Sequence, residues 1–110
     1  TVHDNIVTNA HIDMGDGNDT LTSSGDVERG ASIDMGDGDN TVNLGADIDN
    51  ATLTTGSGDD TINIGDDLQS HASVNTGAGD DSVTVTDAIY DHGSLDTGAG
   101  DDTVSARQMT

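Results

Sequence analysis

Aliphatic residues recur along the chain at spacings of nine, six and six residues, with a single spacing of five. Around them, Thr, Ser, Asn and Asp alternate with small or apolar side chains, which is the period-two pattern of half-buried strands. Helical periodicity is absent, and glycine interrupts every segment. We therefore predict an all-β chain with these inward residues: Ile12, Leu21, Val27, Ile33, Val42, Ile48, Leu53, Ile62, Leu68, Val74, Val83, Ile89, Leu95 and Val104.

The same rhythm defines a sequence repeat of about 21 residues. Cutting before a small residue divides a single repeat domain, residues 1–110, into a partial coil, 1–9, and five coils: 10–30, 31–50, 51–71, 72–92 and 93–110. Such coils, stacked so that equivalent strands pair in parallel, form a β-solenoid of the β-roll or β-helix kind. Because both chain ends fall inside a coil, we expect the chain to be a slice of a longer array.

Composition rules out an ordinary hydrophobic core, because only 30% of the residues are hydrophobic and the chain has no Phe, no Trp and one Tyr. The 22 acidic residues outnumber the 2 basic ones, and the net charge of -20 excludes nucleic acid and anionic membranes as partners. The longest apolar stretch is too short for membrane insertion, and the lack of Cys excludes disulfides and thiolate metal sites. Every acidic residue except Glu28 is Asp, which suits tight turns and hard cations.

Each coil contains one turn of the form G-x-G-[DN]-[DN]-[TS]. Its two glycines permit backbone conformations that let carbonyl oxygens converge, and its last acidic or amide residue lies two positions before an inward aliphatic. Stacking predicts a ladder of these side chains along one edge. We expect a metal site built from Asp19, Asn40, Asp60, Asp81 and Asp102, the preceding Asn18, Asp39, Asp59, Asp80 and Asp101, and the glycines Gly15, Gly17, Gly36, Gly38, Gly56, Gly58, Gly77, Gly79, Gly98 and Gly100.

Calcium is the ion that this spacing favours. Parallel strands lie about 4.8 Å apart, so an ion midway between two stacked oxygens would be about 2.4 Å from each. That distance matches calcium, at about 2.3 to 2.6 Å, better than magnesium, at about 2.0 to 2.1 Å. We expect several Ca²⁺ ions, one between each pair of adjacent turns.

The ladder opposes folding when no ion is bound, because stacked carboxylates repel by about 0.9 kcal/mol per pair even in water. We therefore expect the chelated chain to be largely unfolded and calcium to drive coil formation. Sites with one carboxylate per turn are expected to bind in the range of about 0.1 to 1 mM that is typical of extracellular modules. This affinity predicts a secreted, extracellular or cell-surface location.

The segments GDGNDTLT, GDGDNTVN, GSGDDTINI, GAGDDSVTV and GAGDDTVSA resemble the latter eight residues of the RTX (repeats-in-toxin, haemolysin-type) nonapeptide GGxGxDxUx. In that family the Asp and the turn carbonyls bind calcium in a parallel β-roll. The resemblance implies the same side-chain ligand role for Asp19, Asn40, Asp60, Asp81 and Asp102, and it also implies type I secretion.

The chain departs from the RTX pattern in three respects. The first Gly of the nonapeptide is replaced by Met or Thr in every coil, and the opposite side of the coil has no second motif. This places calcium on one side only, as in the repeat regions of large bacterial RTX adhesins. Asn40 replaces one ligand Asp and brings an oxygen without a charge, so we expect the weakest calcium sites there and tighter binding in Asn40→Asp.

The sequence predicts a calcium-dependent structural or adhesive repeat segment of a secreted or cell-surface bacterial protein, acting as a spacer or adhesion surface. Its expected partners are calcium, neighbouring coils of a longer array, and a cell surface, a glycan or ice. One alternative is a calcium-dependent ice-binding solenoid, because outward Thr, Ser and Asn residues flank each aliphatic of the second strand. Another is a non-catalytic module of a secreted polysaccharide-modifying enzyme; we do not expect catalysis, because every conspicuous Asp is repeated.

His71 and His92 occupy the same place in consecutive coils, so their rings are expected to stack about one strand spacing apart. Both a weak transition-metal pair and a pair of solvated loop residues are compatible with this placement.

Overall fold

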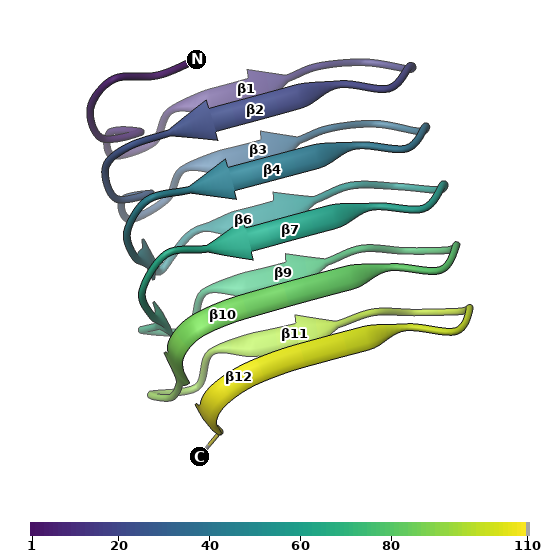
Figure 1. The fold of residues 1–110 in the computed structure, drawn as a ribbon. Helices are drawn as coiled ribbons and strands as arrows, with labels where there is room; N and C mark the ends of the chain where they lie inside the picture. The colour runs from purple at the N-terminus through teal and green to yellow at the C-terminus, as the bar shows by residue number, and fades with distance from the viewer. Residues whose placement is uncertain (110) are drawn as a thin grey trace.

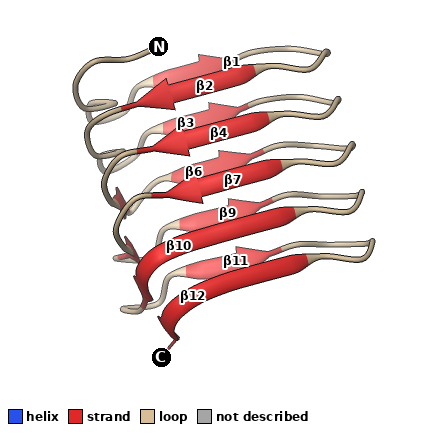
Figure 2. Cartoon of the chain, in the orientation of Figure 1, coloured by secondary structure: helices blue, strands red, loops and turns tan. Residues whose placement is uncertain are grey.

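The chain winds into a parallel β-solenoid of about five turns, which confirms the predicted fold class. The computed structural model describes residues 1–109, and this range contains strands, turns and loops but no helix. Successive coils stack one below the other, with one row of strands behind another (Figure 1). The same view coloured by secondary structure shows the turns gathered at the two edges of the stack (Figure 2).

The first sheet contains one short strand from each coil, in the order β1-β3-β6-β9-β11. Every pair in this sheet is parallel, and partners such as His11 and Ser32 lie one repeat apart in the sequence. The single 20-residue step, Ser32 to Thr52, keeps the inward residues Ile33 and Leu53 paired, so the shorter coil does not disturb the register. The strands are β1 (His11–Asp13), β3 (Ser32–Asp34), β6 (Thr52–Thr54), β9 (Ser73–Asn75) and β11 (Ser94–Asp96).

The second sheet begins after the glycine turn of each coil and runs β2-β4-β7-β10, with β12 pairing β10. Its strands are β2 (Thr20–Ser23), β4 (Thr41–Leu44), β7 (Thr61–Ile64), β10 (Ser82–Ile89) and β12 (Thr103–Met109). A third, narrow side is formed by β5 (Ile48–Asp49), β8 (Leu68–Gln69) and the curved end of β10, where Ile48 pairs with Leu68 and Leu68 with Ile89.

The interior is a column of aliphatic side chains that all three sides supply. Of the predicted inward residues, those of the central coils are buried, including Ile33, Leu53 and Ile62. Ile12 and Leu95 are only partly buried, and the side chain of Val104 is 41% exposed, because these three belong to the outermost coils of the described range. No segment of residues 1–109 forms a helix of the length and hydrophobicity that a membrane span requires.

Candidate metal centre

The glycine turns of successive coils lie directly on one another. Both glycines of every turn have positive φ, for example +89° at Gly77 and +137° at Gly79, a region that side chains other than hydrogen enter only with strain. A Cβ added at Gly77 would run into the carbonyl oxygen of Gly56 in the preceding coil. The two glycines therefore serve both the turn conformation and the close stacking of backbone carbonyls.

The predicted ligand residues form a continuous inner row at this edge. Asn40, Asp60 and Asp81 are only 1 to 2% exposed, whereas Asp19 and Asp102, in the outer coils, are partly buried. In every member after Asp19, one side-chain oxygen accepts a hydrogen bond from the backbone N–H of its counterpart in the preceding coil, as Asp81 does from Asp60 (2.9 Å) and Asp60 does from Asn40 (2.8 Å). These bonds link all five members of the row from Asp19 to Asp102.

The second carboxylate oxygen of the inner row has no partner. Oδ2 of Asp19, Asp60 and Asp81 is buried and makes no hydrogen bond within residues 1–109. An unsatisfied buried polar atom costs about 1 to 3 kcal/mol, and more when the group is charged. Burial raises the pKa of Asp60 above its ordinary value, because removal from water disfavours the charged carboxylate. Each of these three buried oxygens is therefore a candidate ligand for a bound cation.

Asn40 occupies the same position in its coil and has an amide nitrogen, Nδ2, in place of the second carboxylate oxygen. Its Nδ2 donates to the carbonyl oxygens of Gly36 (3.0 Å) and Gly38 (3.0 Å) in the same turn and of Thr55 (3.2 Å) in the next coil. Three carbonyl oxygens from two adjacent coils thus converge on one point. Because the coils stack in constant register, we expect the equivalent carbonyls of the Asp coils to lie on the side of the orphan oxygens. An all-oxygen environment of this kind fits a hard cation such as Ca²⁺.

The residue immediately before each inner-row residue belongs to a second, outer row, which has a different geometry. Asn18, Asp39, Asp59, Asp80 and Asp101 are exposed. Except for Asp101, in the last coil, their side chains accept hydrogen bonds from the backbone of the following coil, as Asp59 does from the N–H of Asp80 (2.8 Å). The structure therefore separates the predicted ligands into an inner row, three of whose members have a buried unpaired oxygen, and an exposed outer row.

The residue before each turn also contributes, which the sequence analysis did not foresee. Met35, Thr55 and Thr76 are fully buried at the position of the first nonapeptide Gly. The hydroxyl of Thr55 donates to the carbonyl of Thr76 (3.1 Å), and the hydroxyl of Thr76 donates to that of Thr97 (3.3 Å). The hydroxyls therefore hold in place the row of carbonyls that faces the inner row of carboxylates.

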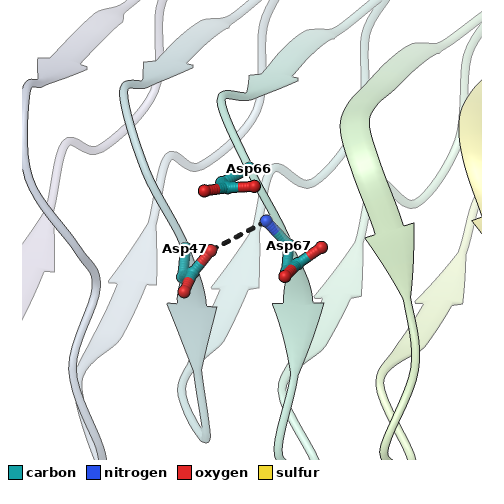
Figure 3. A group of neighbouring side chains, drawn as sticks. All are labelled: Asp47, Asp66 and Asp67. Carbon is teal, nitrogen blue, oxygen red and sulfur yellow. Dashed lines mark hydrogen bonds between the residues drawn. The ribbon is translucent and has the colours of Figure 1, made fainter.

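A second acidic ladder runs along the narrow third side, outside the glycine-turn motif. Asp26, Asp47 and Asp67 each precede an inward aliphatic, and this regular spacing is the signal that could have revealed them. Asp47 accepts from the backbone N–H of Asp67 (2.8 Å), and Asp66 lies beside them, with one carboxylate oxygen of each of the three within 4.8 Å of the others (Figure 3). Both oxygens of Asp47 are paired, because Gln69 donates to the other one (2.7 Å).

The charge of this second ladder opposes folding at neutral pH. The pKa of Asp47 is raised, first by partial burial and then by the neighbouring carboxylates of Asp66, Asp67 and Asp26, although the N–H of Asp67 partly offsets the rise. A folded-state pKa above the unfolded value gives stability that is complete below about pH 3.8 and is lost as pH rises through the folded value.

We expect Asp47→Asn to stabilise the calcium-loaded protein at neutral pH. The gain should decrease as pH falls through the raised pKa of Asp47 and should vanish below about pH 3.8, where the carboxyl is protonated in both the folded and unfolded states. The amide keeps the acceptor for the Asp67 N–H, and Gln69 can reverse its own amide because its partner on the other side is the Tyr90 hydroxyl (2.6 Å). Urea-unfolding midpoints across this pH range measure the effect. Asp49→Asn, two residues further along the chain in β5, controls for the loss of one charge, and an equal, pH-independent gain in both variants would contradict the assignment.

The rings of His71 and His92 stack with centroids 4.7 Å apart and an interplanar angle of 8°, as the register predicts. Both residues have positive φ at the corner where one coil passes to the next, and both are exposed. The pair lies on the third side, away from the glycine turns.

Comparisons of the chain with protein-family models, with curated proteins and with solved structures found no match.

Proposed function

We propose that this chain is a calcium-dependent structural or adhesive repeat segment of a secreted or cell-surface bacterial protein, of the RTX type with one calcium turn per coil. It folds on binding Ca²⁺ and serves as a spacer or adhesion surface, without catalysis. The observation that carries the proposal is the set of buried, unpartnered Oδ2 atoms of Asp19, Asp60 and Asp81. The carbonyls of Gly36, Gly38 and Thr55 around the equivalent atom of Asn40 support an oxygen-lined position for a cation in the Asp coils.

The chemistry of the donors favours calcium over other cations. The oxygen donors at this edge are carboxylates, carbonyls and hydroxyls, and the chain has no Cys, so the site offers none of the thiolates that select zinc or copper. The ligands come from rigid backbone at the strand spacing, so the calcium distances of about 2.3 to 2.6 Å are easier to satisfy than the shorter magnesium ones. The role of the ion is to neutralise the inner row and to join adjacent coils.

A calcium titration by calorimetry, with the bound ions counted after equilibrium dialysis, tests the proposal. We expect at least three Ca²⁺ per chain, corresponding to the three orphan carboxylates, and much weaker binding of Mg²⁺. Asp81→Asn should lose one ion because it removes the charge of a buried ligand. Asp80→Asn makes the same chemical change at the adjacent, exposed position and should retain the full number.

Two outcomes of this titration would contradict the proposal. One is a parent protein that binds no calcium in the millimolar range. The other is equal loss of binding in the two variants, which would show that calcium responds to the general negative charge of this edge rather than to the inner row.

Ice binding is a second candidate function, favoured by the register of the second sheet. Thr20, Thr41, Thr61, Ser82 and Thr103 pair in line across five coils and form one column of small hydroxyl side chains. The neighbouring column is mixed, and within it Asn63 donates to Asn43 (2.9 Å) rather than presenting both amides to water. Thermal hysteresis of the calcium-loaded protein distinguishes this function from a spacer, which would show none.

A further inference from the structure

Asn40 is the one member of the inner row in which both side-chain polar atoms have hydrogen-bond partners in the described residues. Its Oδ1 accepts from the N–H of Asp19 (2.9 Å), the same role that one oxygen plays in Asp60, Asp81 and Asp102. Its Nδ2 makes the three bonds to the carbonyls of Gly36, Gly38 and Thr55. The residue is 1% exposed, and none of its side-chain polar atoms is left unpaired.

Asp60 and Asp81 occupy the same register position in the next two coils but lack these bonds. Their first oxygen accepts from the preceding coil as that of Asn40 does, and only the second oxygen is orphaned. The difference is therefore confined to one atom. A nitrogen carrying hydrogens is attracted to three carbonyl oxygens, whereas a carboxylate oxygen is repelled by them unless a cation lies between.

The backbone of the Asn40 coil also differs from that of the two coils after it. In the later coils the carbonyl of the first turn glycine accepts a hydrogen bond from the following coil, as that of Gly56 does from the N–H of Ala78 (3.1 Å). In the Asn40 coil the equivalent N–H, that of Ser57, donates instead to the side chain of Asp37 (3.0 Å). The carbonyl of Gly36 is then available to the Asn40 amide. Asp37 and Asn40 thus act together at the contact between coils 31–50 and 51–71.

We propose that the Asn40 amide replaces a calcium ion, so that the contact between coils 31–50 and 51–71 is a cation-independent clamp within a cation-dependent array. This inference rests on the proposed calcium function and limits the calcium sites to the coils that have Asp in the inner row. The array binds one ion fewer than its turns would allow. The clamp is the part of the solenoid that keeps its structure longest when calcium is removed, and it supplies a nucleus to which the ion-dependent coils add on either side.

Two reciprocal substitutions test the clamp. Asn40→Asp should gain one Ca²⁺ per chain at saturation and should need a higher calcium concentration to fold, because it exchanges three hydrogen bonds for an unpartnered carboxylate. Asp60→Asn should lose one Ca²⁺ and should melt at a higher temperature in chelator, by about 5 °C or more. If the chelated parent is too unfolded to melt, an excluded osmolyte such as trimethylamine N-oxide restores a measurable transition.

Hydrogen exchange followed by mass spectrometry locates the clamp without any substitution. At calcium concentrations below saturation, peptides covering residues 36–60 should exchange more slowly than the equivalent peptides covering residues 77–102. Uniform exchange across the coils would overturn the inference, as would an Asn40→Asp variant with the ion count of the parent.

These results separate the two proposals. A parent protein that binds no calcium contradicts the proposed function, whereas calcium binding with an unchanged ion count in both variants contradicts only the clamp. An Asp60→Asn variant that is no more stable than the parent in chelator also contradicts the clamp, whatever the ion count.

Discussion

Removal of calcium from the loaded protein is expected to abolish most of its β-structure. At calcium concentrations about 100-fold above Kd, each site stabilises the folded state by about 2.7 kcal/mol, so three sites contribute about 8 kcal/mol. That amount is comparable to the whole stability of a typical domain, about 5 to 15 kcal/mol. Without it, the net charge of -20 and the buried carboxylates of the inner row oppose a core that contains no Phe or Trp.

Far-UV circular dichroism of the chelated and the calcium-loaded protein measures this loss, and readdition of calcium should restore the signal. Magnesium and sodium chloride at matched ionic strength are the controls, because salt screens repulsion between exposed carboxylates but does not fill an oxygen-lined site. Full β-signal under chelator, or equal recovery with sodium chloride, would contradict a structural role for bound calcium.

Gly77→Ala is expected to destabilise the array by about 4 kcal/mol or more, which places it among the largest effects of single substitutions. Two costs combine in this variant. Alanine at a φ of +89° is strained by about 1 to 2 kcal/mol, and its Cβ would also collide with the Gly56 carbonyl of the preceding coil. Because that carbonyl lies at the glycine-turn edge, the stacking distance between the coils must widen and calcium affinity should fall as well.

Gly15→Ala separates the two costs. Gly15 has nearly the same backbone angle, with a φ of +82°, but no atom lies within 4 Å of the position of an added Cβ. It should therefore show only the conformational strain of about 1 to 2 kcal/mol. Urea unfolding of both variants at saturating calcium gives the comparison. Similar losses for the two variants would show that close carbonyl stacking is unimportant at this edge.

The fold was predictable from the sequence because the repeat applies one constraint many times. An inward residue such as Ile62 is identified both by its neighbours and by its counterparts Val42 and Val83, with which it pairs in register. The single shorter coil also kept its predicted alignment. The exposure of Val104 shows the limit of this reasoning, because a position that is inward in the repeat is buried only where coils lie on both sides of it.

The sequence predicts which residues belong to the candidate site, but it does not predict which of them are buried and which are exposed. Asp59 and Asp60 are identical neighbours in the sequence, yet one is solvated and the other carries a buried orphan oxygen. This distinction depends on which side of the turn faces the next coil. The amide bonds of Asn40 were likewise out of reach, because one of their acceptors, the carbonyl of Thr55, comes from a different coil.

The most direct test of the account is an anomalous difference map from crystals grown in calcium. The account predicts peaks beside Oδ2 of Asp60 and Asp81, coordinated by turn carbonyls of two adjacent coils, and no peak beside the amide of Asn40. A map in which the ions lie only along the exposed row of Asp59 and Asp80, or one with no peaks at this edge, would contradict it.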